Sequence, residues 1–554
     1  MNRNTESHFS LNPHVDISRS RFDRSASVKT SFNVGDIVPF YVEEVLPGDT
    51  FQVKSSKVVR MQTLLTPMMD NVYLDTYYFF VPNRLLWQHW KEFCGENTES
   101  AWIPETVYNV PQLVSPSGTG WTVGTIADYF GIPTGVPGLS VNALPFRAYA
   151  LIINEWFRDQ NLQDPLNVPL DDSTVTGVNT GTFVTDVAKG GKPYIASKYH
   201  DYFTSCLPSP QKGPDVTIPV AEAANYPVVP LAQQVPASLI GSQKYTASGV
   251  LYDAARIDFD ASGAQKSEYF AAGGGVIDTY GAPVINNLWA VAEGNAQAAT
   301  INQLRLAFQI QKFYEQQARG GSRYTEVVRS FFGVTSPDAR LQRPEYLGGN
   351  RIPINVNQVI QQSGTESSGT PQGTVVGMSQ TTDTHDDFMK SFTEHGFIIG
   401  VMCARYDHTY QQGLNRMWSR KDKFDYYWPV FANIGEQAVK NKEIYATGSA
   451  SGSKDDEVFG YQEAWADYRY KPSQVTGEMR SQYEKSLDVW HLADDYAQLP
   501  TLSDSWIRED KNNVDRVLAV TSKVSNQLFA DIYVTNYATR PVPMYSVPGL
   551  IDHH

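Results

Sequence analysis

Two groups of strand-like segments, one towards each end of the chain, constrain the fold more than any other feature. Both groups are rich in aromatic and β-branched residues, which favour strands. The expected strands are residues 36–46, 49–59, 72–81, 396–406, 514–521 and 526–535. A sheet that uses both groups joins distant parts of the sequence, which predicts a β-sandwich with large insertions between its strands. Periodicity alone does not exclude an α+β enzyme.

Two prolines give local information about the first two expected strands. Pro47 and Gly48 form a two-residue turn signal between the first two segments. Pro39 lies inside the first segment and has no N–H to donate to a neighbouring strand. We therefore expect an edge position or a β-bulge at Pro39.

Helical periodicity appears between the two groups of strands. Residues 144–160 carry large apolar side chains at helical spacing. A short helix is expected to begin at Asn83, as its N-cap, and to stop at Gly95, and another is expected over residues 323–332.

The clearest helix is expected to begin at Thr300, which can form a capping box with Gln303. The pair Gly320-Gly321 ends it. Its apolar residues cover more than one face, so we expect this helix to be well buried.

Residues 164–298 differ in composition and periodicity from the rest of the chain. The run over residues 208–284 is rich in Gly, Ala, Val and Pro and has few periodic segments. An unstructured loop of that length is unusual in a compact domain, so we expect it to fold, to pack on neighbours, or both. Shorter polar loops are expected at residues 361–380 and 448–457.

Both termini are expected to be extended. The first thirty residues are polar and lack periodicity, which indicates an arm. The tail over residues 540–554 contains three prolines, which cannot donate to a strand ladder. We expect the tail to lie along a surface or a neighbouring subunit.

The net charge of −14 argues against nucleic-acid binding through average charge. Any such contact must come from local basic patches. The arm has a balance of only +2, because Arg3, Arg19, Arg21, Arg24 and Lys29 face Glu6, Asp16 and Asp23. An ordinary flexible or interface-bound tail is the alternative.

Residues 420–431, RKDKFDYYWPVF, interleave basic and aromatic side chains. Cations and stacking aromatics hold single-stranded nucleic acid without sequence preference. The commoner meaning of such a pattern is a subunit interface or a core segment.

The sequence contains no phosphate-binding loop, dinucleotide fingerprint, zinc-protease motif or nucleophile elbow. The densest group of ligand-type side chains is His385, Asp386, Asp387, His395, Cys403 and His408. Its spacing fits no metal motif, so we expect a solvated loop beside a buried cysteine. The pairs at residues 171–172, 455–456 and 494–495 are expected to be surface charge rather than glycosidase carboxylates. We expect no catalytic residue, metal or cofactor.

Three widely spaced cysteines, Cys94, Cys206 and Cys403, offer no disulfide framework and fit assembly in a reducing cytosol. The N-terminus lacks the apolar region of a signal peptide. No apolar run approaches the roughly 20 residues that span a bilayer. We expect a soluble chain.

The stretch FFGVTSPDARLQRPEYLGG at residues 331–349 resembles the major capsid protein of the gokushovirus branch of the Microviridae, which are small single-stranded DNA phages. Further blocks that resemble this family lie at residues 35–51, 58–87, 414–445, 455–481, 486–496 and 540–550. The blocks run in family order and make up roughly a quarter of the chain.

This resemblance implies a mainly β fold, an eight-stranded viral jelly-roll β-barrel with large helical and loop insertions. It implies a virion with a T=1 icosahedral shell, assembled in the host bacterial cytoplasm, around a circular single-stranded DNA genome. The organisation expected from it is a basic arm at residues 1–30, one capsid domain at residues 31–554, and a tail at residues 540–554. Within the domain, residues 205–295 are expected to form a variable surface protrusion at the threefold axes.

The resemblance also implies partners. They are further copies of the chain, an internal scaffolding protein, a DNA pilot protein, a small basic DNA-binding protein and a bacterial surface receptor. The basic protein would supply the positive charge that this acidic chain lacks. The candidates for facing DNA are Arg19, Arg21, Arg24, Arg420, Lys421 and Lys423. The candidates for host contact are Gly273, Gly274 and Gly275.

Two other classes of protein remain as alternatives. Eleven tryptophans and many carboxylates are compatible with a glycan-active enzyme, whose mark would be two carboxylates about 5 to 10 Å apart in a pocket. A lectin-like β-sandwich binding module would instead be a stable monomer or small oligomer with a sugar or metal site.

Overall fold

The computed structural model describes residues 18–96, 106–214, 301–321, 323–335, 342–363, 371–448 and 452–545, with isolated residues and short strands between residues 216 and 290. The chain divides into two compact units. The larger unit comprises Met1–Lys212 and Glu315–His554, and the smaller comprises Gly213–Tyr314.

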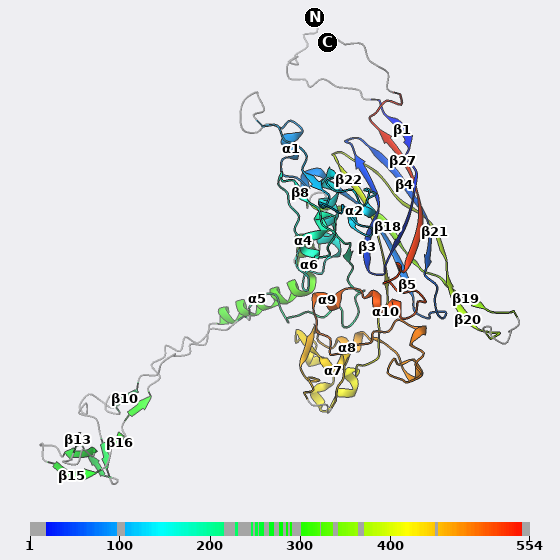
Figure 1. Cartoon of the computed structure of the whole chain (residues 1–554). Helices are drawn as coiled ribbons and strands as arrows, with labels where there is room; N and C mark the ends of the chain where they lie inside the picture. Colours follow the sequence, from blue (N-terminus) through cyan, green and yellow to red (C-terminus); the bar gives the residue numbers. More distant parts are fainter. Residues whose placement is uncertain are drawn as a thin grey trace, which may run out of the picture. The chain divides into compact units, whose positions relative to one another are not determined.

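Two antiparallel sheets form the centre of the larger unit (Figure 1). The first contains β2 (Ala26–Phe32), β27 (Leu528–Arg540), β4 (Thr50–Met61) and β21 (Thr381–Ser391), and β1 (Ser20–Asp23) also pairs with β27. The second contains β18 (Glu345–Pro353), β5 (Val72–Pro82), β22 (Gly396–Tyr406) and β3 (Asp36–Val45), with the two-residue β9 (Tyr194–Ile195) beside β3.

The order of these strands identifies the fold. When the eight long strands are numbered along the chain, the first sheet has the order 1-8-3-6 and the second has the order 2-7-4-5. Each sheet therefore alternates strands from the two ends of the sequence, which is the arrangement of a jelly roll. The expected fold class is confirmed.

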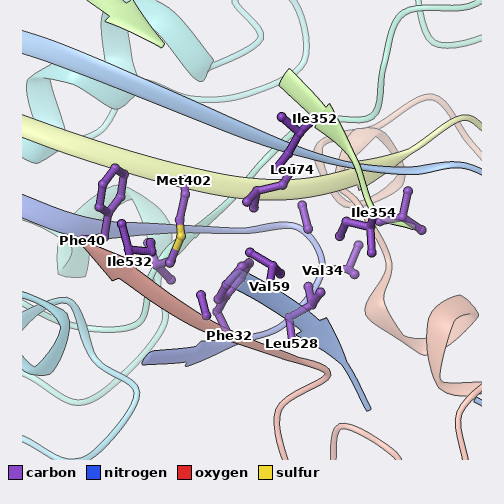
Figure 2. Packing of buried hydrophobic residues seen from close by; sticks show 14 of the residues in the cluster. Phe32, Val34, Phe40, Val59, Leu74, Ile352, Ile354, Met402, Leu528 and Ile532 are labelled. Carbon is purple, nitrogen blue, oxygen red and sulfur yellow. The ribbon is translucent and has the colours of Figure 1, made fainter. Parts of the chain in front are cut away.

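The main core lies between the two sheets. Buried and exposed residues alternate along β27, because one face of the strand packs inward and the other faces solvent. Figure 2 shows Leu528 and Ile532 of β27 and Val59 of β4 facing Leu74 and Met402 of the second sheet. Full burial of each such side chain contributes about 1.5–3 kcal/mol.

The second sheet is covered on its other face as well, so nearly every residue of β22 is buried. The cover comes from the long connection between β5 and β18. Its helix α3 (Leu144–Ile152) continues as a π-helical turn (Ile153–Phe157) and packs with the outer side chains of β5 and β22. α2 (Ile126–Tyr129) and α4 (Phe183–Asp186) lie on the same side (Figure 1).

The connection between β22 and β27, residues 407–527, forms a lobe of short elements that we call the C-terminal lobe. Its apolar core includes Tyr410, Val439, Phe459 and Trp506. Its elements are β23 (Thr409–Tyr410), β24 (Glu436–Lys440), α7 (Asn441–Ile444), β25 (Val458–Glu463), α8 (Ala466–Arg469), β26 (Ser473–Gln474), α9 (Asp504–Ile507), α10 (Lys511–Asp515) and 3-10 turns at Arg416–Ser419, Lys423–Asp425, Pro429–Phe431, Gly477–Met479 and Asp488–Trp490.

The remaining elements are short. In the larger unit they are a 3-10 turn (Asn83–Leu85), α1 (Trp90–Phe93), β6 (Gln112–Val114), β7 (Ser140–Asn142), β8 (Val175–Thr176), a 3-10 turn (Val187–Lys189), α6 (Tyr324–Phe332), β19 (Val356–Ile360) and β20 (Val375–Ser379). The strands of the smaller unit are β10 (Val228–Pro230), β11 (Tyr245–Ala247), β12 (Val250–Tyr252), β13 (Ala254–Phe259), β14 (Gln265–Phe270), β15 (Val276–Tyr280), β16 (Val284–Ile285) and β17 (Leu288–Ala290). α5 spans Ile301–Gly320.

Five of the six expected strands are confirmed, as β3, β4, β5, β22 and β27. The expectation of a strand at residues 514–521 is wrong, because α10 and turns occupy that segment. Val514 and Val517 are fully buried there, and a short apolar run does not distinguish a buried strand from a buried turn. The bulge expected at Pro39 is confirmed, since the pairing register between β3 and β22 shifts beside it.

The expected helices at residues 144–160 and 323–332 are confirmed. The expectation that Asn83 is an N-cap is wrong. Pro82 is the N-cap of the 3-10 turn there, and no side chain donates or accepts a capping hydrogen bond. Thr300 lies outside the described residues. α5 exists and ends at Gly320, but the expectation of deep burial is wrong, because Leu306 and Phe308 are 60% and 61% exposed.

The described part of the N-terminal arm is not separate from the sheet. β1 and β2 pair along β27, so residues 20–32 form an edge of the first sheet, whereas we expected an extended arm through residue 30. The polar loop expected at residues 361–380 is partly a hairpin, made by β19 and β20. Of the described helices, none has the length and apolar character needed to cross a membrane.

Candidate interface

The C-terminal lobe exposes an unusual concentration of aromatic side chains. Trp418, Phe424 and Val430 are 70%, 61% and 88% exposed. The full set, which we call the aromatic surface, is Trp418, Phe424, Tyr426, Tyr427, Trp428, Val430, Tyr468 and Tyr470. Contiguous exposed apolar residues of this size mark interaction sites in soluble proteins, whereas single exposed apolar residues are ordinary.

Local hydrogen bonds hold the segment over residues 420–431 in place. The Asp422 carboxylate accepts bonds from the backbone N–H groups of Phe424 and Asp425, at 2.6 and 3.2 Å. The Asp425 carboxylate accepts bonds from the N–H groups of Lys421 and Asp422, and these bonds lower its pKa. The 3-10 turn Lys423–Asp425 is thereby capped by its own side chains, which fixes the position of the aromatic residues beside it.

Two further contacts attach this segment to the rest of the lobe. Arg420 forms a buried ion pair with Asp467 and stacks over the ring of Tyr468, at 4.2 Å from its centroid. The indole of Trp465 donates to the carbonyl oxygen of Phe431 at 2.8 Å. The aromatic surface is therefore ordered before any partner covers it, which reduces the entropy lost on binding.

A cavity of about 180 Å³ lies beside the aromatic surface. Its lining includes Tyr410, Trp418, Asp467, Tyr470 and Arg480. The Oδ1 atom of Asp467 is buried and accepts no hydrogen bond from the described residues. An unpaired buried acceptor is costly, so this cavity suits a donor supplied by a partner.

Apolar area, rigidity and chemistry together point to a protein interface. Interface hot spots are enriched in Trp, Tyr and Arg and lie in well-packed pockets. The aromatic surface contains Trp and Tyr, and a pocket lined by Trp418, Tyr470 and Arg480 lies at its margin. This agrees with the interface alternative for residues 420–431.

The six residues expected to face DNA do not gather at one place. Arg24 pairs with the nearly buried Glu43 at 2.7 Å, and the guanidinium of Arg21 lies 4.4 Å from the ring centroid of Tyr537. Arg19 contacts the turn at Gly48. Arg21 lies in β1 of the first sheet with Arg19 and Arg24 on either side of that strand, and the other three belong to the C-terminal lobe.

The basic residues of the lobe differ from one another. The charge of Arg420 is used internally, by Asp467. Lys421 and Lys423 are exposed, and the ammonium of Lys423 lies 5.0 Å from the centroid of the Phe424 ring. Gly273, Gly274 and Gly275 lie outside the described residues. The roles of all nine residues stay predictions.

A second polar site was not expected from the sequence. His408 is buried between two carboxylates, with Nδ1 2.9 Å from Asp494 and Nε2 3.1 Å from Glu509. The ammonium of Lys198 also contacts Asp494, at 3.1 Å. Burial lowers the pKa of His408, but the two carboxylates outweigh it and raise the pKa to about 9. His408 therefore carries a proton at neutral pH.

Two expectations about acidic and ligand-type residues are wrong. Asp494 is buried and is not surface charge. Its carboxylate can be buried because His408 and Lys198 pair with it. His385, Asp386 and Asp387 lie in β21 and not in a solvated loop, where Asp386 pairs with Lys54. Cys403 is buried as expected, and burial raises the pKa of its thiol.

The described residues contain no group of three or more His, Cys, Asp and Glu side chains placed to hold a metal ion. The charged cluster around His408 could not be found by sequence pattern. Lys198, His408, Asp494 and Glu509 are far apart in the sequence, and only the fold brings them together. The aromatic surface could be anticipated from the sequence, because residues 424–431 form a run rich in aromatic side chains.

Comparison with known proteins confirms the expected resemblance. Residues 10–550 match the family model described as capsid protein (F protein). The chain is 44% identical to capsid protein VP1 of Spiroplasma virus 4, over 98% of this chain and 97% of that protein. It is 41% identical to capsid protein VP1 of Chlamydia phage 1 (98% and 97%) and 41% identical to that of Bdellovibrio phage phiMH2K (99% and 98%).

Proposed function

The chain belongs to the capsid protein (F protein) family, and from this premise we propose that its copies close a T=1 icosahedral shell around a circular single-stranded DNA genome. Self-assembly into the shell of a phage particle, and so residence in the virion, follows from the family itself. The role is structural and not enzymatic, and neither a glycan-active enzyme nor a lectin-like module has support.

The observation that carries the proposed assembly is the aromatic surface. One chain leaves it uncovered, although eight large apolar side chains are exposed there and hydrogen bonds hold the turn at Lys423–Asp425 in place. A second copy of the chain is the occupant that a self-assembling protein supplies at the required concentration. Contacts that are weak singly become strong when closed symmetry repeats them on every copy.

The proposed shell needs partners that one chain does not provide. We assign assembly to the host bacterial cytoplasm, with an internal scaffolding protein, a DNA pilot protein and a small basic DNA-binding protein. The net charge of −14 supports the last of these, because an acidic shell does not neutralise DNA by itself. The exposed Lys421 and Lys423 are better placed for DNA contact than Arg420, whose charge Asp467 neutralises.

Residues 205–295 are proposed to form a protrusion at the threefold axes that contacts a bacterial surface receptor. The separate compactness of Gly213–Tyr314 supports an inserted segment with a role of its own. The arm at residues 1–30 and the tail at residues 540–554 are proposed to reach neighbouring subunits.

The first test is negative-stain electron microscopy of the full chain co-expressed with its neighbouring phage genes. Uniform icosahedral particles with bumps at the threefold axes are expected. A soluble monomer under conditions in which all partners are expressed would contradict the proposal. A second test deletes residues 215–281, which should leave assembly intact and reduce host binding. Loss of particles with unchanged host binding by free subunits would count against the protrusion.

A further inference from the structure

A buried lysine, an asparagine and an aspartate meet between the two sheets of the jelly roll. The ammonium nitrogen of Lys57 lies 2.7 Å from Oδ1 of Asn350 and 3.2 Å from Oδ2 of Asp383. The amide nitrogen of Asn350 donates to the same Oδ2 atom, at 2.8 Å. All three side chains therefore contact one another.

The position of each residue follows from strand register. Lys57 belongs to the inward-facing series of β4, where burial alternates along the strand, and its side chain is fully buried. Asp383 lies directly opposite it on β21, in the same sheet. Asn350 lies on β18 of the other sheet, opposite Thr76 of β5. The contact between Lys57 and Asn350 thus bridges the two sheets.

Thr76 completes the group. It is 1% exposed, and its hydroxyl donates to Oδ1 of Asn350 at 2.7 Å. This carbonyl oxygen therefore receives two donors, the Thr76 hydroxyl and the Lys57 ammonium. Donors fixed on a carbonyl oxygen stabilise the negative charge that forms there when a nucleophile attacks the carbon.

We propose that Lys57 and Asn350 form an intramolecular isopeptide bond that joins the two sheets covalently, with Asp383 as the proton carrier and Thr76 as a stabilising donor. The residue types supply an amine nucleophile, a carboxamide and a carboxylate in mutual contact. Fixed proximity replaces the bimolecular step that makes the same reaction negligible between free side chains.

The reaction balances without any other reagent. Asp383 takes a proton from the Lys57 ammonium, and the freed amine attacks Cγ of Asn350. The C–N bond to the Asn350 amide nitrogen then breaks, and that nitrogen leaves as ammonia, with protons returned by Asp383. One ammonium ion is released, the Asp383 carboxylate is restored, and no oxidant or reductant is needed.

The charge state of Asp383 before the reaction affects how fast the isopeptide bond can form. Burial raises the pKa of Asp383, but the hydrogen bond from Asn350 and the charge of Lys57 outweigh it, so this pKa is lowered. Asp383 therefore begins as a carboxylate, and in the proposed reaction it takes the proton that Lys57 gives up. We expect the bond to accumulate after folding, because the unfolded chain does not bring the three residues together.

The charged cluster around His408 provides a matched comparison. There a buried lysine, Lys198, and an asparagine, Asn513, share the carboxylate of Asp494. They contact different oxygens of it, Oδ2 and Oδ1, and no hydrogen bond between the two is present. Because the Lys198 ammonium makes no hydrogen bond to the Asn513 carboxamide, we expect no isopeptide bond at this second site.

The experiment is mass spectrometry of the purified, folded full chain after denaturation. The wild-type chain should be lighter than its sequence mass by one ammonia, and a tryptic digest should contain a branched peptide that joins Lys57 to Asn350. The variants K57R and D383N should have their full sequence masses. The control variant K29M, at a lysine whose side chain is 72% exposed, should keep the deficit of one ammonia.

A wild-type chain at its full sequence mass, with an unbranched peptide cleaved after Lys57, would overturn the proposal, whatever the variants do. Simple deamidation of Asn350 would raise the mass and leave the peptides unbranched, so it would also overturn it. A D383N variant that keeps the deficit would overturn the role of Asp383. This test needs only folded subunits, so failure of the shell to assemble does not affect it.

Discussion

The jelly-roll sandwich and the C-terminal lobe use aromatic residues in opposite ways. In the sandwich, long strands send alternate side chains inward, so Phe51 and Tyr78 are fully buried. In the lobe, short 3-10 turns change direction every few residues, and Trp418 and Phe424 remain largely exposed. The long strands bury their apolar side chains within one chain. The lobe leaves apolar side chains exposed that another molecule can cover.

The C-terminal lobe also depends on buried charge. Where the lobe meets the connection between β5 and β18, His408 and Lys198 face Asp494 and Glu509 in a buried cluster. Buried charges of this kind are weak evidence for stability but are very sensitive to loss of one partner. The sandwich should therefore resist changes at its surface, while the lobe should be sensitive at the cluster and neutral at its aromatic surface until copies assemble.

The largest effect is expected on assembly, from Val430→Asp in the aromatic surface. An ionised carboxylate in an apolar contact costs several kcal/mol, and closed symmetry repeats that cost on every copy. Particle yield by electron microscopy and sedimentation should fall to background, while the thermal unfolding of free subunits stays unchanged.

Val107→Asp is the matched control for this substitution, because both valines are 88% exposed and Val107 lies outside the lobe. We expect normal particles from the control variant. Equal loss of particles from both variants, or normal particles from Val430→Asp, would remove the distinction between the two regions.

The next effect is on subunit stability, from Asp494→Ala. Removing this carboxylate leaves two buried cations without their shared partner, which should cost about 3–5 kcal/mol of unfolding free energy. Denaturant unfolding of the subunit measures it. Asp495→Ala, at the exposed neighbouring position, should change stability by less than about 0.5 kcal/mol. Similar losses in both variants would show that the cluster is not special.

Ile398→Ala in β22 tests the sandwich. The side chain is fully buried between neighbouring strands, so its removal should cost about 2–5 kcal/mol. Ile434→Ala in the lobe is the comparison, because that side chain is 51% exposed and its loss should be nearly neutral in the free subunit. The comparison fails if calorimetry gives both variants the same unfolding temperature.

Stability should also depend on pH through His408. Its pKa is raised from 6.5 to about 9 in the folded chain, so its contribution is present in full below pH 6.5 and is lost as the pH rises through about 9. The loss should be about 3 kcal/mol at most. Unfolding free energies measured from pH 6 to 10 should fall in the wild type and be flatter in His408→Gln. Parallel curves would assign the decline to other groups.

The smallest effect is expected at the surface of the sandwich. Lys29 of β2 lies 3.4 Å from Asp531 of β27, and both side chains are more than half exposed. Water and salt screen such a pair, so Lys29→Ala should change the unfolding free energy by less than about 1 kcal/mol. A larger loss that persists at high salt would mean that the edge formed by β2 depends on this pair.

The sequence by itself determined the long strands, the helix at residues 144–160 and the family. Aromatic and β-branched runs such as residues 72–81 and 396–406 strongly favour a strand, and both are strands in the structure. The sequence blocks that resemble the family are long and specific. Local patterns did less well where burial decides the outcome. Residues 514–521 look like a strand but pack as a helix and turns, and α5 has apolar residues that one chain does not cover.

Only the tertiary structure decided which distant residues meet. The jelly-roll order places β2 beside β27 and β18 near β21, so Lys57, Asn350 and Asp383 converge from three strands. The same is true of the cluster around His408. Such groups leave no local pattern, because strand pairing depends on the packing of both sheets at once and not on neighbouring residues in the chain.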